Sequence, residues 1–189
     1  MNESLLKEFI ERFPIPKGNS KKPYIILFDA YNGMGKSTVS LEISKHEDVV
    51  ILNNDEVRNF LNDYKDETGL KNKLQKYRLE ELLKNNNNCI YDSCFCHNYK
   101  SKLKYFNDLG YNYYIIRLEC SDKVVEERLR KRTLDGINYS IADYNSYLWM
   151  KSHIERVPLN KIDFTINIEI ELESQVKELI KYIRNNQKL

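Results

Sequence analysis

The segment from Asp29 to Thr38 contains the best-defined chemical signal in this sequence of 189 residues. It reads DAYNGMGKST and fits the pattern G-x-x-x-x-G-K-[ST], except that Ala30 stands where the pattern has its first glycine. The two glycines let the backbone turn its N–H groups inward around phosphates, the lysine can reach the terminal phosphates, and the serine hydroxyl can ligate Mg²⁺. The sequence therefore predicts a nucleotide-binding loop that consists of Asn32, Gly33, Met34, Gly35, Lys36, Ser37 and Thr38.

A carboxylate and a guanidinium follow the next apolar run. Asp55 and Arg58 are three residues apart at a predicted helix start, so they lie on one face of its first turn. Neighbouring parallel strands end at the same edge of a sheet, and Asp55 is therefore expected to face the phosphate loop. A carboxylate there can orient an acceptor hydroxyl and take its proton, and Arg58 can clamp a phosphate on the acceptor. The ordinary structural alternative is an N-cap aspartate beside an exposed arginine.

Asp92 closes the apolar run at 89–91 in a way that resembles a Walker B strand. It is expected to hold Mg²⁺ through water or to bind the acceptor. The alternative is a turn aspartate without chemistry, since Asp-Ser pairs often close strands.

Two arginines four residues apart, Arg128 and Arg132, lie on one face of a predicted helix near 121–135. Arginines on a mobile lid helix can close over ATP and neutralise charge on the transferring phosphoryl group. A charged run is more commonly just a solvated helix face, which stays as the alternative.

Two further patterns are weaker. Cys94, Cys96 and His97 lack paired C-x-x-C spacing and a fourth ligand, which favours a packed or site-lining loop over a zinc site. The segments 160–163 (NKID) and 66–69 (DETG) match GTPase motifs, but neither follows a buried strand. We interpret both as chance matches outside the context that these motifs require.

Short apolar runs alternate with longer amphipathic segments along the chain. This alternation predicts an α/β fold with a parallel sheet covered by helices on both faces. The four asparagines at 85–88 are expected to form a solvated turn. A helix at 4–13 and a Pro/Gly-containing linker are expected to form an N-terminal unit at 1–22, followed by one domain at 23–189. The expected strands are 24–28, 49–52, 89–91, 111–118 and 164–168, and the expected helices after the linker are 36–45, 55–62, 70–84, 99–109, 122–131, 141–152 and 172–184.

Composition excludes several classes of protein. Apolar residues make up 41% of the chain, which is enough for a core and excludes a wholly disordered protein. The net charge of +2 gives no overall attraction to nucleic acid or to an anionic membrane, so any basic surface must be local. The longest apolar run, 24–28, is far too short to cross a membrane. Four unevenly spaced cysteines suggest reduced thiols, and we expect a cytoplasmic location.

The sequence resembles the P-loop kinases of the polynucleotide kinase and seryl-tRNA kinase group, which are AAA_33-type ATP-binding kinases. The resemblance consists of four features in the same order: the loop AYNGMGKS, the Asn-Asp-x-x-Arg stretch, the third-strand aspartate and the arginine pair. The resemblance covers about residues 23 to 170. It implies a three-layer P-loop NTPase fold whose five-stranded parallel sheet has the order 2-3-1-4-5. It also implies the roles of Asp55 as general base, of Lys36, Arg128 and Arg132 in stabilising the transferred phosphoryl group, of Ser37 and Asp92 at Mg²⁺, and of Asp55, Arg58 and Asp92 at the acceptor.

One departure leaves the acceptor open. The family often has Asp-Thr-Asn and then an arginine after the third strand, whereas Asp92 leads here into SCFCHNYKSK, with Lys100 and Lys102 as the nearest cations. The loop is also similar to that of thymidylate kinases. We expect an ATP- and Mg²⁺-dependent kinase acting on a hydroxyl of a polynucleotide 5′ end, a tRNA or a nucleotide. The alternatives are a small-molecule or thymidylate-type nucleotide kinase, a GTPase-like switch and a nucleotide-binding module without turnover; the oligomeric state stays open.

Overall fold

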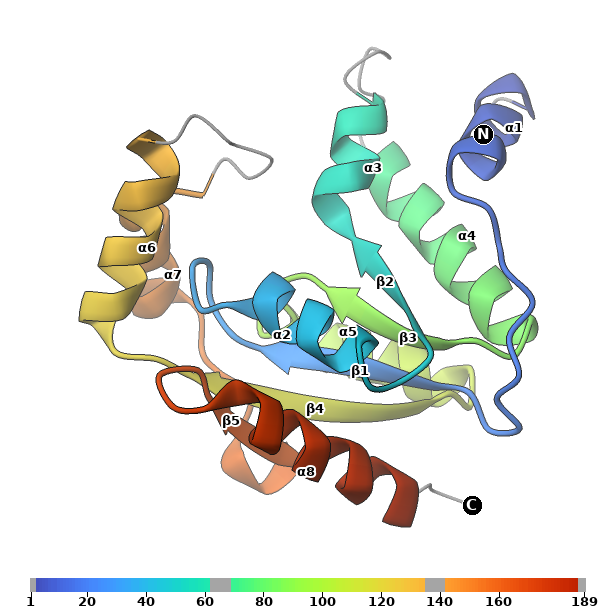
Figure 1. The fold of residues 1–189 in the computed structure, drawn as a ribbon. Helices are drawn as coiled ribbons and strands as arrows, with labels where there is room; N and C mark the ends of the chain where they lie inside the picture. Colours follow the sequence, from blue (N-terminus) through green and yellow to red (C-terminus); the bar gives the residue numbers. More distant parts are fainter. Residues whose placement is uncertain (1–2, 62–68, 135–141, 187–189) are drawn as a thin grey trace.

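The computed structural model describes residues 3–61, 69–134 and 142–186. Its centre is one parallel sheet of five strands in the order β2-β3-β1-β4-β5, which confirms the expected order (Figure 1). Register brings the ends of neighbouring strands level, because Asn53 at the end of β2 pairs with Asp92 at the end of β3. The strands are β1 (Tyr24–Asp29), β2 (Val49–Asn53), β3 (Asn88–Asp92), β4 (Asn112–Glu119) and β5 (Phe164–Asn167).

Helices separate the strands as the alternating pattern predicts. In chain order they are α1 (Glu3–Arg12), α2 (Lys36–Ser44), α3 (Asn54–Leu61), α4 (Leu70–Lys84), α5 (Tyr99–Asp108), α6 (Asp122–Leu134), α7 (Tyr144–His153), the 3₁₀ helix η1 (Leu159–Lys161) and α8 (Leu172–Asn185). Helix α7 begins later than the expected residue 141, because Asp143 caps it by accepting a hydrogen bond of 2.7 Å from the backbone N–H of Ser146. No helix in these ranges is long and apolar enough to cross a membrane.

The sheet is the middle of three layers. All six residues of β1 are buried, and its side chains alternate between two cores, as a strand covered on both faces requires. Ile26 and Phe28 pack into a core with α2 and α8, whereas Ile25 and Leu27 pack into a core with α4 and α5. Figure 1 shows α2 and α8 in front of the sheet and α5 behind it.

Helix α1 packs against the helices that follow β2. Leu5 and Phe9 are buried in a third apolar cluster together with Val57 and Phe60 of α3 and Leu74 of α4. The rings of Phe9 and Phe60 lie 5.5 Å apart in an edge-to-face arrangement. The N-terminal helix therefore contributes directly to the packing of α3.

Only the first half of the asparagine run at 85–88 is exposed to solvent as the sequence suggested. Asn85 and Asn86 are exposed, but Asn87 and Asn88 are buried, and Asn88 is the first residue of β3. The Asn87 side-chain amide donates hydrogen bonds to the carbonyl oxygens of Pro16 (2.9 Å) and Leu82 (3.0 Å). The prediction is wrong for these two residues, because the Asn87 amide bonds buried backbone carbonyl groups and Asn88 pairs with Val49 of β2 in the sheet; turn propensity cannot reveal either role.

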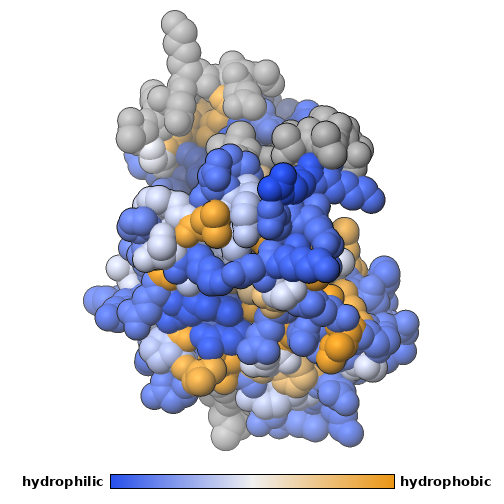
Figure 2. Space-filling view, turned by 90° about the vertical axis from the view of Figure 1, so that its left-hand side faces the viewer, coloured by the Kyte–Doolittle hydropathy of each residue, from blue (hydrophilic) through white to orange (hydrophobic). Residues whose placement is uncertain are grey.

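Helices α6 and α7 stand together at one end of the molecule, on the left of Figure 1. The face on that side is largely hydrophilic, and its hydrophobic residues form small separate patches (Figure 2). Asp122 at the start of α6 accepts hydrogen bonds of 2.6 Å from the Tyr147 hydroxyl and the Lys151 ammonium, both on α7. The two helices are thus tied to each other by charge and hydrogen bonding as well as by packing.

Candidate active site

The loop between β1 and α2 has the backbone of a phosphate cradle. Gly33 and Gly35 have φ angles of 79° and 84°, in the left-handed region that favours glycine. Gly35 is also the N-cap of α2, and no side chain caps the first-turn N–H groups of that helix. Uncapped amides and the positive end of the helix dipole suit an anion. The Lys36 ammonium donates to the Tyr31 carbonyl oxygen at 2.8 Å, which holds it inside the loop.

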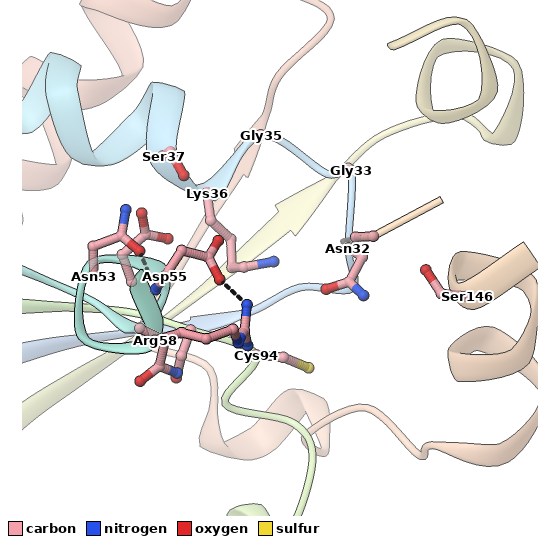
Figure 3. Close-up of a pocket in the computed structure, with 14 residues that line it drawn as sticks. Asn32, Gly33, Gly35, Lys36, Ser37, Asn53, Asp55, Arg58, Cys94 and Ser146 are labelled. Carbon is pink, nitrogen blue, oxygen red and sulfur yellow. Dashed lines mark hydrogen bonds and ion pairs between the residues drawn. The ribbon is translucent and has the colours of Figure 1, made fainter. Parts of the chain in front are cut away.

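A cavity of about 360 Å³ lies beside this loop at the carboxyl edge of the sheet. In Figure 3 the side chains of Asp55 and Arg58 point toward each other, the ends of Lys36 and Cys94 extend from beside them toward Asn32, and Ser146 lies beyond Asn32. The structure therefore brings loop residues and acceptor-side residues into one cavity. Of the predicted site residues, those that line it are Asn32, Gly33, Gly35, Lys36, Ser37, Asp55, Arg58 and Asp92.

Other predicted site residues do not line the cavity. Met34 is buried beneath the loop, where its sulfur accepts a hydrogen bond of 3.2 Å from the Tyr31 N–H. Thr38 is exposed on α2. Arg128 lies close to the loop, because a Cβ atom built on Gly35 would be 3.1 Å from Nη1 of that arginine. This nitrogen is buried and has no hydrogen-bond partner among the described residues. Arg132 belongs to α6, but its side chain lies outside the described residues.

Asp55 is held in the first turn of α3 by its neighbours. Its backbone N–H donates to the Asn53 side-chain oxygen at 2.8 Å, so Asn53 takes the capping role that the sequence left open for Asp55. The Asp55 carboxylate is instead free to pair with the Arg58 guanidinium. From α4, the buried Gln75 amide donates to the Asn53 carbonyl oxygen at 3.1 Å and to the Asn54 side-chain oxygen at 2.9 Å. These contacts fix the start of α3 beside the cavity.

The predicted Mg²⁺ ligands have suitable chemistry and position. Ser37 and Asp92 both line the cavity, and both carry oxygen atoms. Mg²⁺ prefers oxygen ligands and usually takes one or two carboxylates together with waters and substrate phosphates. The residues present therefore fit a magnesium ion that would be shared with a bound phosphate.

A buried ion-pair network lies immediately before the loop, and the sequence analysis did not find it. Asp29 is completely buried, and its carboxylate accepts from Nε of Arg117 at 2.7 Å, from Nε of Arg156 at 3.1 Å and from the Val157 N–H at 3.1 Å. The guanidinium of Arg156 also lies over the Tyr31 ring. The one visible signal was Arg117 itself, a charged residue within the apolar run of β4.

Two thiols meet at the edge of the cavity. Cys94 lines the cavity, and its Sγ atom lies 3.1 Å from Sγ of the buried Cys96, with a hydrogen bond between them. That hydrogen bond, followed by the charge of Lys36, lowers the pKa of Cys94, and the same contact raises the pKa of Cys96. His97 is exposed, and the described residues contain no group of three or more potential metal ligands. The segment is therefore in part packed, at Cys96, and in part site-lining, at Cys94.

The GTPase-like segment at 160–163 has a structural role. Asp163 precedes β5, and its carboxylate accepts a hydrogen bond of 2.8 Å from the Ile115 N–H of β4. Asp163 therefore stabilises the pairing of β4 and β5. It does not lie after the carboxyl end of a strand at the cavity, where the GTPase motif would have to be. The other GTPase-like segment, 66–69, falls almost entirely outside the described residues.

The AAA_33 family, described as an AAA domain, matches residues 26–157. Solved structures share the fold across nearly the whole chain. APS kinase CysC of Mycobacterium tuberculosis, solved with AMPPNP and APS, is 17% identical, with 86% of this chain and 98% of that chain covered and a TM-score of 0.55. A gluconokinase from Sinorhizobium meliloti is 15% identical, with coverages of 87% and 92% and a TM-score of 0.57. A fungal RNA kinase is 12% identical, with coverages of 89% and 88% and a TM-score of 0.56. No curated protein sequence matches this chain.

Proposed function

This chain belongs to the AAA_33 family, and from that family and the cavity we propose that it is a kinase that transfers the γ-phosphate of ATP to a hydroxyl group. One observation carries the proposal. A phosphate loop and a carboxylate from the next strand-to-helix junction line the same cavity, so that a donor and an acceptor can meet there.

The proposed roles follow from position and charge. Loop amides between residues 32 and 38 bind the ATP phosphates, and Lys36 turns from the Tyr31 carbonyl oxygen to the terminal phosphates. Asp55 takes the proton of the acceptor hydroxyl as its oxygen attacks the γ-phosphorus and the bond to the β-phosphate oxygen breaks. Ser37 and Asp92 would hold Mg²⁺, which supplies charge neutralisation at the phosphates when bound.

Helix α6 is proposed as the lid. Arg128 has a buried nitrogen without a hydrogen-bond partner next to Gly35, so its charge already lies against the phosphate loop. Arg132 follows four residues later in α6. Closure of this helix would bring guanidinium groups to the transferring phosphoryl group and would exclude water.

A basic surface beside the cavity favours a polynucleotide 5′-hydroxyl as the acceptor. The first parts of α4 and α5 carry Lys71, Lys73, Lys76, Lys100, Lys102 and Lys104 at exposed or half-buried positions. Two of these lysines have an acidic neighbour one turn further along, since Lys76 lies 3.9 Å from Glu80 and Lys104 lies 2.6 Å from Asp108. This charge is local, because the whole chain has a net charge of only +2. A chain of phosphates is the partner that such a lysine surface suits best.

The basic surface also contains a hollow next to the active site. A second cavity of about 300 Å³ lies between α4 and α5 and is lined in part by Lys76, Lys102 and the ring of Tyr105. Lys102 connects the walls of the two cavities, because its ammonium donates a hydrogen bond of 2.9 Å to the carbonyl oxygen of Cys94, which lines the first cavity. A nucleotide whose hydroxyl lies at Asp55 could therefore continue onto this surface, where a base could stack on the Tyr105 ring if Lys76, whose ammonium lies 4.9 Å from the ring centre, moved to a phosphate.

The test is transfer of labelled γ-phosphate from ATP to a panel of 5′-hydroxyl oligonucleotides, tRNA, nucleosides, nucleotides and sugars. Lys36→Ala is expected to abolish transfer to every acceptor. Transfer by Lys36→Ala at the wild-type rate would contradict the assignment of the site. Nucleotide hydrolysis with a preference for GTP and without transfer to any acceptor would favour a switch instead.

The acceptor class has its own test. Lys76→Gln and Lys102→Gln should each weaken oligonucleotide binding and reduce the slope of log K against log salt by about 0.7, the value for one phosphate contact on a single strand. Lys177→Gln on α8 is the matched control, because α8 covers the opposite face of the sheet. An unchanged salt slope in both test variants, with transfer to sugars or nucleosides retained, would point to a small-molecule acceptor.

A further inference from the structure

Cys94 and Cys96 form a rigid pair of thiols that the proposed phosphoryl transfer does not use. Their sulfur atoms lie 3.1 Å apart, and the residue between them, Phe95, is completely buried. The Phe95 N–H donates to the Phe28 carbonyl oxygen of β1 at 3.3 Å, which anchors this segment on the central strand. On its other side, Lys102 donates to the Cys94 carbonyl oxygen. The two thiols are thus held together by their backbone.

The two thiols differ in access. Cys94 is half-buried and lines the cavity of about 360 Å³, so a small reagent that enters the cavity can reach it. Cys96 is 2% exposed and lies behind it, with its sulfur 3.7 Å from the Ala30 carbonyl oxygen. One accessible sulfur with a second sulfur in contact behind it is the arrangement of a reacting cysteine and a resolving cysteine.

We propose that Cys94 and Cys96 are an oxidative modification site, at which a hydroperoxide converts the two thiols into a disulfide. In the first step Cys94 Sγ attacks the terminal peroxide oxygen, the O–O bond breaks, and the thiol proton leaves with the alcohol or water that forms. Cys94 becomes a sulfenic acid. In the second step Cys96 Sγ attacks Cys94 Sγ, the S–O bond breaks, and the hydroxyl leaves as water with the Cys96 proton. The peroxide is reduced by two electrons and the thiol pair is oxidised by two.

Geometry favours this pair over the other cysteines. A disulfide needs a sulfur–sulfur separation of about 2 Å, so the two Sγ atoms must approach by roughly 1 Å. All four cysteines lie in the described residues, and the contact at 3.1 Å joins Cys94 to Cys96. Cys89 is fully buried within β3, and Cys120 follows β4. We therefore expect oxidation to be confined to the pair beside the phosphate loop.

The experiment treats the reduced full-length chain with hydrogen peroxide, without nucleotide, and then unfolds and alkylates it for peptide mass spectrometry. The expected product is a peptide that contains both Cys94 and Cys96, has lost two hydrogen atoms and carries no alkyl group, while Cys89 and Cys120 are alkylated. Full alkylation of Cys94 and Cys96, or a disulfide that joins either of them to another cysteine or another chain, would overturn the proposal.

Variants identify the order of the two steps. In Cys96→Ser, Cys94 should stop at the sulfenic acid and be trapped by dimedone, whereas Cys94→Ser should give neither adduct nor disulfide. Cys120→Ser is the matched control and should form the disulfide as the wild type does. A dimedone adduct on Cys96 in the Cys94→Ser variant would reverse the assignment of the attacking cysteine. Every readout is a mass, so the result does not depend on whether the chain is a kinase.

Discussion

Asp29→Asn is expected to destabilise the fold strongly, although it changes only one functional group. The Asp29 side chain is completely buried at the end of β1 and accepts hydrogen bonds from Arg117 of β4, Arg156 and the Val157 N–H. The two guanidinium groups are themselves largely buried, with 11% and 25% of their side chains exposed. An asparagine would remove the one negative charge and would direct an amide N–H₂ toward groups that are donors.

The magnitude follows from the burial of the partners. Removal of one partner of a buried ion pair typically costs about 3 to 5 kcal/mol, because the remaining charge is left without compensation in a place that water does not reach. For a chain of this size each kcal/mol lowers the melting temperature by about 2 to 4 °C, so a decrease of roughly 6 to 20 °C is expected. Urea denaturation should show a lower midpoint with an unchanged slope.

A double-mutant cycle separates this ion pair from a general effect of the substitution. Asp29→Asn, Arg156→Gln and the double variant should show a coupling of about 0.5 to 3 kcal/mol, because the second change removes a charge that the first left unpaired. Asp108→Asn, which breaks the exposed contact with Lys104, is the matched control and should leave the midpoint unchanged. Additive effects at positions 29 and 156, or a loss at position 29 no larger than in the control, would refute the reasoning.

Three further changes test the loop, the proposed base and the N-terminal helix. Asp55→Asn should lower turnover by about 10² to 10⁴ while calorimetry detects unchanged ATP binding, and wild-type turnover would exclude Asp55 as the base. Gly35→Ala and Gly69→Ala should each lower the free energy of unfolding by about 1 to 2 kcal/mol, because alanine is strained in the left-handed region. Only the Gly35 Cβ meets neighbouring atoms, so nucleotide affinity should fall for Gly35→Ala alone. Phe9→Ala should cost about 3 to 5 kcal/mol in urea denaturation, whereas Ile10→Ala at the exposed edge of α1 should change little.

The sequence was sufficient for the elements of the fold because local patterns encode them. The all-buried run at 24–28 and the loop that follows it identify the central strand and its helix without any knowledge of tertiary contacts. The order of the strands could not be predicted from such local patterns; its prediction came from the resemblance to P-loop kinases. Asp55, Arg58 and Asp92 were found because each follows or begins an element at the carboxyl edge of the sheet, where parallel strands place their ends together.

The missed features depend on contacts between residues far apart in the chain. Asp29 and Arg156 are separated by 127 positions, and nothing in the residues around either of them indicates the other. The Asn87 amide likewise reaches back 71 positions to Pro16, so that a residue typical of turns becomes part of the core. Cys94 could be placed in a site-lining loop from its position after β3, but its contact with Cys96 required the conformation of that loop.

The contact between Asp55 and Arg58 bears on which acceptor the cavity can use. In this structure the Arg58 guanidinium pairs with Oδ1 of the Asp55 carboxylate, so one of the two oxygens of the proposed base is engaged and the other can still accept a proton from a hydroxyl. An acceptor that carries a phosphate near its hydroxyl would draw Arg58 away, because a phosphate offers the guanidinium the same charge and a matching pair of oxygens. Binding of that phosphate would then release Oδ1 as well, so that either oxygen of Asp55 could take the proton. A simple sugar has no phosphate for Arg58 to bind, whereas the 5′-terminal nucleotide of a strand carries a phosphate on its 3′ side. For the proposed nucleic-acid acceptor, Arg58 would therefore supply a phosphate contact in addition to those of the lysines on α4 and α5.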